Sequence, residues 1–186
     1  MKKHKVLWLS IAGIILVPAL IVGGYTAYLA LAPTKTEFQG TAHANKVLSQ
    51  SSLTKDQFNE LVQKHLANTN YAVKLSGNNV VASGTAMDGN VSAKLTMTPT
   101  VTKDGNVIMS VKKAVVNGTT VPGQVALGYL KKITTLPAGV TVQPDKSQIA
   151  LDVNRLTDDG TSAYKVDQIN IAKGIFNFSE VASDAQ

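Results

Sequence analysis

The sequence predicts an α+β protein: an N-terminal transmembrane helix, followed by a curved antiparallel β-sheet packed on two amphipathic helices. Three observations lead to this fold class. Close to the start of the chain lies a long segment without charged residues, residues 6–32. Later segments alternate apolar and polar residues with period two and are joined by short turns, which is typical of antiparallel strands. Two further segments have apolar residues at helical spacing, and they are the available cover for one face of the sheet.

The uncharged segment, residues 6–32, exceeds the roughly 20 residues that a helix needs to span a bilayer. The apolar core of a secretory signal is shorter, about 7–15 residues. A small-x-small cleavage motif ends at Ala32, but Pro33 follows it directly, and proline fits poorly into a protease that binds an extended chain. We therefore expect an uncleaved signal anchor, with cleavage after Ala32 as the alternative.

The charges before the span predict its orientation. Residues 1–5 form a basic head with Lys2, Lys3 and Lys5, and the positive-inside rule keeps such a head in the cytoplasm. The rest of the chain then lies outside the cell membrane, as the C-terminal part of a single-pass protein. We expect a polar stalk over residues 33–51 and an extracytoplasmic α+β domain over residues 52–186.

Composition excludes several functions. Three of the eighteen Lys and Arg residues lie in the head, so the remainder carries fifteen against twelve acidic residues. No basic stripe with interleaved aromatics is present, so we expect no nucleic-acid partner. Contact with anionic lipid headgroups or wall polymer is the alternative to a merely solvated surface. The absence of cysteine excludes disulfides, thiolate metal sites, a cysteine nucleophile and an acylated cysteine.

The first helix is predicted from about residue 54 onward. Thr54 and Gln57 have the spacing of a capping box, and Leu53 and Phe58 that of a hydrophobic staple. One face of the helix gathers the apolar positions and one histidine: Phe58, Leu61, Val62, His65 and Leu66.

A β-hairpin follows. Its first strand places Val91, Ala93, Leu95 and Met97 on one face, and its second strand places Val107, Met109 and Val111 on one face. Residues 103–106, KDGN, form the turn between them. Pro99 marks a strand end, an edge or a bulge. Asp88-Gly89 and Asn117-Gly118 indicate further turns.

The remaining elements continue the pattern. A second helix is predicted over residues 122–133, with Val125, Tyr129, Leu130 and Ile133 on one face. Strands follow at Val140 and Val142, at Ile149, Leu151 and Val153, and at Tyr164 and Val166. Residues 157–160, TDDG, turn the chain before the third of these strands. The alternation of apolar and polar residues shifts by one position at Asp167-Gln168, which predicts a β-bulge. Phe176 and Phe178 lie on the last strand.

Four segments, in chain order, resemble the YpmS-like family of Gram-positive bacteria: FNELVQKHL, MTPTVTKDGNVIMSV, VPGQVALGYLKKITTLPAGVTVQP and VDQINIAKGIFNF. The resemblance runs from about Leu53 to Phe178. Members of this uncharacterised family have one N-terminal transmembrane segment and an extracytoplasmic domain, so the resemblance implies the same location and fold here. It also implies a long curled sheet around a helix, similar to tubular lipid-binding domains. It offers no catalytic motif.

Tests for catalytic and metal-binding patterns favour a protein that is not an enzyme and has no cofactor. The histidines are His4, His43 and His65, without a metalloprotease spacing. Ser52 and Lys55 spell SxxK, but the other motifs of penicillin-binding enzymes are only echoed, at Ser76-Gly77-Asn78 and in the KDGN turn. The Asp-Gly turns at residues 104–106 and 158–160 are weak cation candidates, because turns use these residues anyway.

The apolar faces of the sheet and helices carry the functional expectation. They are first of all core, but an incompletely closed sheet would leave an apolar groove for an acyl chain, to which methionine side chains adapt well. The candidate groove residues are Val91, Leu95, Met97, Val107, Met109, Val111, Val125, Tyr129, Leu130, Ile149, Leu151 and Val153. We expect binding of lipid or another apolar cell-envelope component. The alternatives are a scaffold for a cell-envelope protein partner and, third, a small hydrolase using Ser52 and Lys55.

Overall fold

The computed structural model describes residues 36–40, 46–66, 71–86, 91–133, 136 and 138–183. The predicted head and transmembrane segment, residues 1–32, lie outside this range. Within the described residues no helix combines the length and the apolar character that crossing a membrane requires. These residues form mainly antiparallel β-sheet with few helices, which confirms the α+β class.

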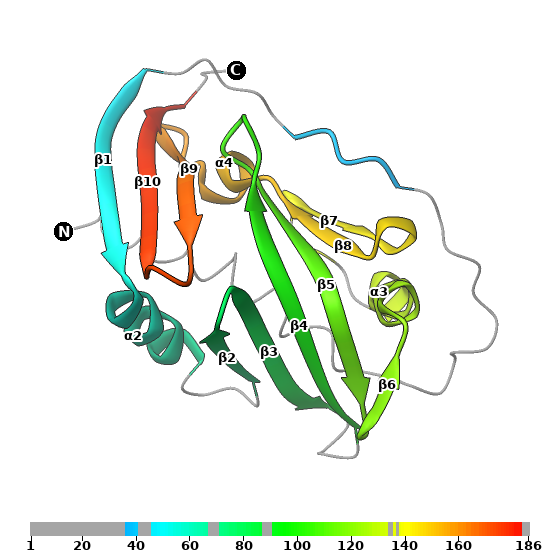
Figure 1. Cartoon of the computed structure of the whole chain (residues 1–186). Helices are drawn as coiled ribbons and strands as arrows, with labels where there is room; N and C mark the ends of the chain where they lie inside the picture. The colour runs from blue at the N-terminus through cyan, green and yellow to red at the C-terminus, as the bar shows by residue number, and fades with distance from the viewer. Residues whose placement is uncertain are drawn as a thin grey trace.

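The strands form two sheets, where the sequence predicted one (Figure 1). The larger sheet has the order β2-β3-β4-β5-β8-β7, with β6 paired to β5. Its strands are β2 (Tyr71–Ser76), β3 (Asn79–Ala86), β4 (Val91–Val101), β5 (Val107–Val116), β6 (Thr119–Val121), β7 (Val140–Gln143) and β8 (Gln148–Leu151). The smaller sheet has the order β1-β10-β9, with strands β1 (Val47–Thr54), β9 (Ser162–Asn170) and β10 (Ile175–Ala182).

Strand β1 was not predicted, and its first residues, 47–51, fall in the segment that we expected to be a stalk. The strand pairs antiparallel with β10, from Val47 opposite Val181 to Thr54 opposite Ile175. Nearly all of its residues are exposed. An exposed strand has no buried face and therefore no alternating apolar pattern, so no local signal for it exists in the sequence.

Helix α2 (Lys55–Leu66) begins where the capping box predicted. The backbone N–H of Thr54 donates to Gln57 Oε1 at 2.9 Å, and the backbone N–H of Gln57 donates to Thr54 Oγ1 at 3.3 Å. Its inner face is the predicted one, with four buried side chains: Phe58, Leu61, Val62 and Leu66.

Helix α3 (Gly123–Ile133) confirms the second predicted helix, but its buried face is rotated from the predicted one. Leu127 and Leu130 are fully buried and Ala126 is nearly so, whereas Val125 is only half-buried. The face that packs against β5, β7 and β8 is therefore centred about two residues beyond Val125.

The β4–β5 hairpin matches its prediction, including the turn at residues 103–106. In β4, Ala93, Leu95 and Met97 are buried on one face. A bulge in β5 at Lys112 shifts the register, since Thr96 pairs with Lys113 and Met97 with Val111. Pro99 lies past the last paired residue of β3, so β4 is locally an edge there and no ladder hydrogen bond is lost on that side.

The predicted strand from Ile149 to Val153 is shorter than expected. Strand β8 ends at Leu151, and a short helix, α4 (Val153–Thr157), begins after Asp152. The side chain of Asp152 accepts a hydrogen bond from the backbone N–H of Arg155 at 3.1 Å and so caps this helix. The helix N-cap overrides the period-two alternation that the sequence shows here.

The predicted bulge in β9 is present. Asn177 pairs with Gln168 while its neighbour Phe178 pairs with Val166, so Asp167 is the extra residue. The bulge keeps Val166 buried on the core side and lets the strand continue beside β10.

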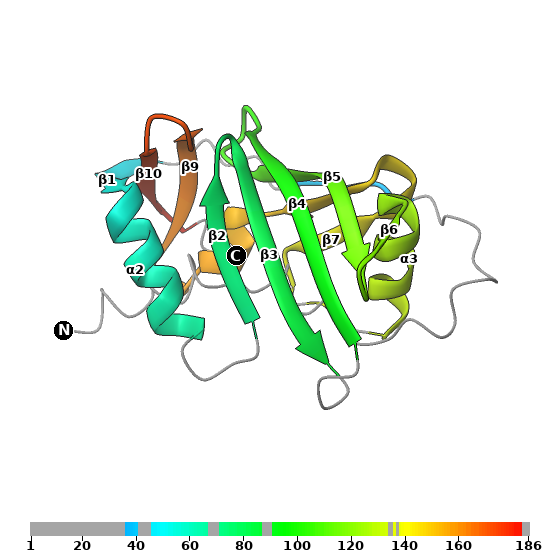
Figure 2. The ribbon, with the colours of Figure 1, turned by 60° about the horizontal axis from the view of Figure 1, so that its bottom comes forward.

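One hydrophobic core joins both sheets and the helices. Figure 2 shows α2 and α3 at opposite ends of the large sheet, with the small sheet beside α2. The core residues with almost no exposure include Phe176, Leu95, Met97, Leu127 and Leu130. The side of the large sheet that faces the core is therefore covered by helices and by the small sheet together.

Candidate functional site

A small, partly enclosed apolar cavity of about 40 Å³ lies between the two sheets. Its wall is built by α2, by β3, β4 and β5 of the large sheet, and by the β9–β10 hairpin: Phe58, Val80, Pro99, Val107, Met109, Val166, Ile169, Ile171, Phe176 and Phe178. No polar residue lines it, and apolar cavities of this kind stay dry. This seam between the sheets is the candidate binding site.

Aromatic stacking fixes one end of the seam. The rings of Phe58 on α2 and Phe176 on β10 are stacked, with centroids 4.6 Å apart and planes within 8°. Such a pair contributes about 0.5–1.5 kcal/mol beyond the area that it buries. The stack therefore ties α2 to the small sheet, while the helix also contacts β2 of the large sheet.

The two sheets are joined mainly by side-chain packing. Among the described residues, the backbone hydrogen bond between them is from Val166 N–H to Gly105 O, at 2.9 Å. Gly105 lies in the β4–β5 turn, and its lack of a side chain lets the turn reach β9 beside Lys165. The ladder hydrogen bonds of either sheet do not depend on the distance between the sheets, so the seam is the part of the core that can widen most easily.

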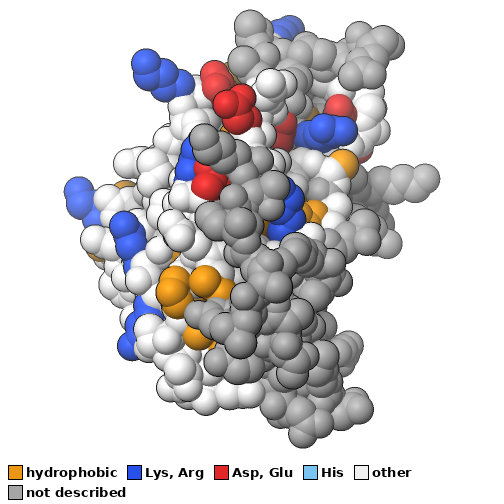
Figure 3. Space-filling view, turned by 90° about the vertical axis from the view of Figure 1, so that its right-hand side faces the viewer, with side chains coloured by type: hydrophobic (Ala, Val, Ile, Leu, Met, Phe, Trp, Pro, Cys, Tyr) orange, Lys and Arg blue, Asp and Glu red, His pale blue; other side chains and the backbone are white. Residues whose placement is uncertain are grey.

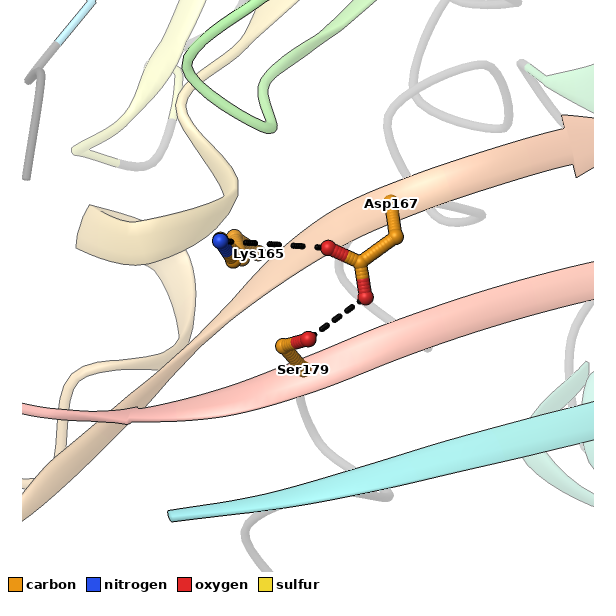
Figure 4. A network of polar contacts seen from close by, with 3 residues as sticks. All are labelled: Lys165, Asp167 and Ser179. Carbon is orange, nitrogen blue, oxygen red and sulfur yellow. Dashed lines mark hydrogen bonds and ion pairs between the residues drawn. The ribbon is translucent and has the colours of Figure 1, made fainter. Parts of the chain in front are cut away.

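Polar contacts support the β9 bulge from the solvent side (Figure 4). Asp167 lies 3.9 Å from Lys165 Nζ through Oδ1, and its Oδ2 accepts a hydrogen bond from the buried hydroxyl of Ser179. Nearby, burial and the negative charges of Glu180 and Asp159 raise the pKa of Tyr164. These groups stabilise the hairpin that forms one wall of the cavity, and none of them points to catalysis.

Most of the predicted groove residues are packed into the core. The fully buried ones, exposed by 3% or less, are Leu95, Met97, Val107, Met109, Leu130, Ile149, Leu151 and Val153. Val111 and Val125 are half-buried, and the side chains of Val91 and Tyr129 lie outside the described set. Of all of these, Val107 and Met109 line the cavity. For the other fully buried ones the structure gives a core role, and contact of any of the predicted residues with a ligand stays a prediction.

Sequence reasoning did not assign the second wall of the cavity to the site. Phe58 was predicted on the apolar face of its helix, and Phe176 and Phe178 were predicted on the last strand without a role in the site. The packing of the last hairpin against β4 and β5 is a long-range contact that no local pattern contains. An available signal was the spacing of Phe176 and Phe178, which places two large apolar side chains on one face of the last strand.

The residues tested for catalysis serve structural roles where they are described. The hydroxyl of Ser52 on β1 donates to Asn177 Oδ1 at 2.9 Å, and Lys55 begins α2. Asp158 and Asp159 accept hydrogen bonds from backbone N–H groups of their own turn. Among the described residues no group of three or more His, Cys, Asp or Glu side chains could hold a metal ion.

Comparison with known proteins places nearly the whole chain in one family. Residues 2–182 match the family described as an uncharacterized protein conserved in bacteria, DUF2140. Neither the curated proteins nor the solved structures contain a match. The matched range includes the head, the apolar leader, both sheets and the seam between them. The chain therefore belongs to this family of conserved bacterial proteins, DUF2140.

Proposed function

We propose that this chain is a membrane-anchored extracytoplasmic protein that binds a lipid acyl chain or another apolar component of the cell envelope. Residues 6–32 serve as the anchor and residues 1–5 as the cytoplasmic head, as their length and charge favour. Within the bacterial family, we further propose that the chain is of the YpmS-like type found in Gram-positive cells. The protein acts by binding and not by catalysis.

The observation that supports this proposal is the cavity in the seam. Its lining is wholly apolar and includes Met109, whose flexible thioether adapts to irregular ligands. At about 40 Å³ it is far smaller than the ~300–1,000 Å³ of typical ligand sites. Binding therefore requires the small sheet to move away from β4 and β5, with the cavity as the starting point.

A photoreactive fatty acid tests the proposal on the full chain in phospholipid vesicles. Cross-links mapped by mass spectrometry should fall on the lining, above all on Met109 and Ile169. The variant Ile169→Trp should lower the cross-linking yield by about tenfold, because a large ring placed in the seam competes with the ligand.

The matched control is Ile175→Trp. This residue is half-buried on β10 like Ile169 on β9, but it does not line the cavity. Equal yields from the two variants, or cross-links spread over the surface without enrichment at the seam, would contradict lipid binding there.

A second candidate function, protein interaction, is favoured by strand β1. Within the described residues it pairs only with β10, so its other edge offers free backbone groups to an added strand. Val47 and Leu48, exposed by 42% and 49%, lie at its start. A photo-cross-linking amino acid at position 48 should capture one defined envelope protein in membranes, and a random set of products would exclude this alternative.

A further inference from the structure

The large sheet has a second face, opposite the core, on which the described strand residues include lysines and no carboxylate. Lys74 on β2, Lys94 on β4 and Lys113 on β5 all occur at exposed positions of this face, with Lys112 at the β5 bulge. The register brings them together, because Lys74 pairs with Val81, Val81 with Thr96, and Thr96 with Lys113. We call this surface the lysine face.

No acidic residue neutralises the lysine face from within its own strands. Strands β2 to β6 contain neither Asp nor Glu. Among the described residues, the ion pair that the structure shows is on the small sheet, between Lys165 and Asp167. Figure 3 shows Lys and Arg side chains along its left-hand edge, the side toward the viewer in Figure 1, while the visible carboxylates lie in the upper half.

The lysine face is also hollowed. An open depression of about 440 Å³ lies where small side chains cluster on neighbouring strands: Ala72, Ser83, Gly84, Thr85, Ser92, Ala93, Lys94 and Val115. Its volume falls in the range of ligand sites, about 300–1,000 Å³. The serine and threonine hydroxyls and the lysine ammonium of this lining can donate hydrogen bonds to phosphate oxygens. The depression lacks aromatic rings, so it is suited to polar headgroups more than to stacked sugars.

The chain enters the domain on the outer side of this same sheet. Gln143 Nε2 donates to the backbone oxygen of Thr36, and Lys131 Nζ donates to its hydroxyl. In the sheet register Gln143 pairs with Gln148, which pairs with Ser110, and these positions alternate with core residues such as Ile149. Residues 36–40, which we call the strap, therefore lie on the side of the sheet that carries the lysine face.

A short connection follows from this position of the strap. From Ala32, the end of the proposed anchor, to Thr36 the chain reaches at most about 14 Å. A domain held so closely cannot stand clear of the bilayer, and the side on which its chain enters is the side nearest the membrane.

We propose that the lysine face docks on the anionic phospholipid headgroups of the membrane that holds the anchor. The inference rests on the anchoring part of the proposed function. Each lysine near an anionic surface raises affinity by about fivefold, so the four together distinguish anionic from neutral lipid clearly. The contact is electrostatic and weakens in salt, since the Debye length falls to about 3 Å at 1 M.

Lysine acetylation tests the proposal on the full chain in vesicles of phosphatidylcholine, with or without phosphatidylglycerol. At low salt, phosphatidylglycerol should slow the acetylation of Lys74, Lys94 and Lys113 by about fivefold or more, and high salt should abolish the effect. Lys55 and Lys173, exposed beside the β9–β10 turn and outside the strands of the lysine face, should each react at the same rate in both vesicles. If each of the five lysines were acetylated at the same rate with and without phosphatidylglycerol, the proposal would be overturned.

Charge-reversal variants give the matched control. The triple variant Lys74→Glu, Lys94→Glu and Lys113→Glu should lose the protection of Lys112, whereas an equally charged triple variant at exposed lysines elsewhere should keep it: Lys46→Glu, Lys55→Glu and Lys173→Glu. Loss of protection in both triple variants would show a net-charge effect and overturn the assignment to this face. Protection by an anionic wall polymer, but not by phosphatidylglycerol, would also overturn it.

Alkaline carbonate extraction separates failure of docking from failure of anchoring. A chain that stays in the vesicles while its lysines react freely refutes the docking alone. A chain that carbonate releases refutes the anchor, and with it the membrane part of the proposed function.

Discussion

Gly105 occupies a position where two properties of glycine are needed at once. Its φ of +75° lies in the left-handed region, and a Cβ built there would lie 2.5 Å from Lys165 Cβ. Its carbonyl also accepts the hydrogen bond from Val166 N–H that joins the two sheets. Next to it, the side chain of Asn106 accepts a hydrogen bond from Val153 N–H at 3.1 Å, which ties α4 to the same turn.

We expect Gly105→Ala to lower the free energy of unfolding by about 3 kcal/mol, the sum of backbone strain and overpacking against Lys165. Gly77→Ala is the matched control, because Gly77 has φ +55° but a methyl group added there would meet nothing within 4 Å. The control should lose only about 1 kcal/mol. Urea unfolding of both variants measures the difference, and equal losses would show that the approach of the turn to β9 is not tight.

At the scale of single elements, the capping box is the clearest link between sequence and structure. Thr54 ends β1 and also caps α2, so one residue sets both the end of a strand and the start of a helix. Its partner Gln57 is exposed, and its side-chain oxygen Oε1 accepts a hydrogen bond from the backbone N–H of Thr54. This helix carries Phe58 to its stack with Phe176, so the cap also positions one wall of the seam.

We expect Thr54→Ala to destabilise the protein by about 1 kcal/mol, the usual value for a lost N-cap. Ser51→Ala is the control, since Ser51 is exposed on the same strand and does not cap a helix. Thermal unfolding should show a lower midpoint for the first variant than for the second. If Ser51→Ala destabilised the protein as much as Thr54→Ala, the loss of stability would come from the change in strand β1 and not from the lost helix cap.

Local patterns predicted α2, α3 and the strands β4, β5 and β7 to β10, whereas β1, β2, β3 and β6 were not predicted. At α4 the prediction failed because a second pattern competed. The bulge at Asp167 was predicted because the apolar phase changes there, and the register confirms it. Helix α4 was missed because Ile149, Leu151 and Val153 alternate as a strand would, while the cap at Asp152 acts only once the chain has turned. In both cases the sequence contains the signal for the observed structure. The burial of side chains in the folded chain decides whether that signal or the simple alternation determines the local structure.

At the scale of the whole molecule, the division into two sheets could not be predicted. β1 has no apolar alternation, and its partner β10 lies at the other end of the chain. The predicted groove residues were therefore assigned to one open sheet, whereas the small sheet covers part of that face and makes most of them core. The cavity exists only where the two sheets meet, so its second wall depends on this pairing.

The strap couples the start of the domain to the large sheet, and Gln143 and Lys131 both donate hydrogen bonds to it. Gln143 is 1% exposed, donates to Thr36 O and accepts from Gln148 Nε2 at 2.7 Å. We expect Gln143→Ala to speed amide hydrogen exchange in residues 36–40 by about tenfold, because one net hydrogen bond is worth about 1 kcal/mol or slightly more. Gln39→Ala, at an exposed strap position, should leave exchange unchanged, and an unchanged rate in both would mean that other contacts hold the strap.

The pairing of β1 with β10 also sets the order in which the molecule can be completed. Ser49 donates to Glu180 across 131 residues of chain, so β1, which precedes the other described strands, has no partner until nearly everything else has been made. Contacts of such long range are slow to form. Newly made molecules therefore pass through a stage in which the large sheet is built while the apolar side of α2 is still uncovered, and it is at this stage that they are most prone to aggregate.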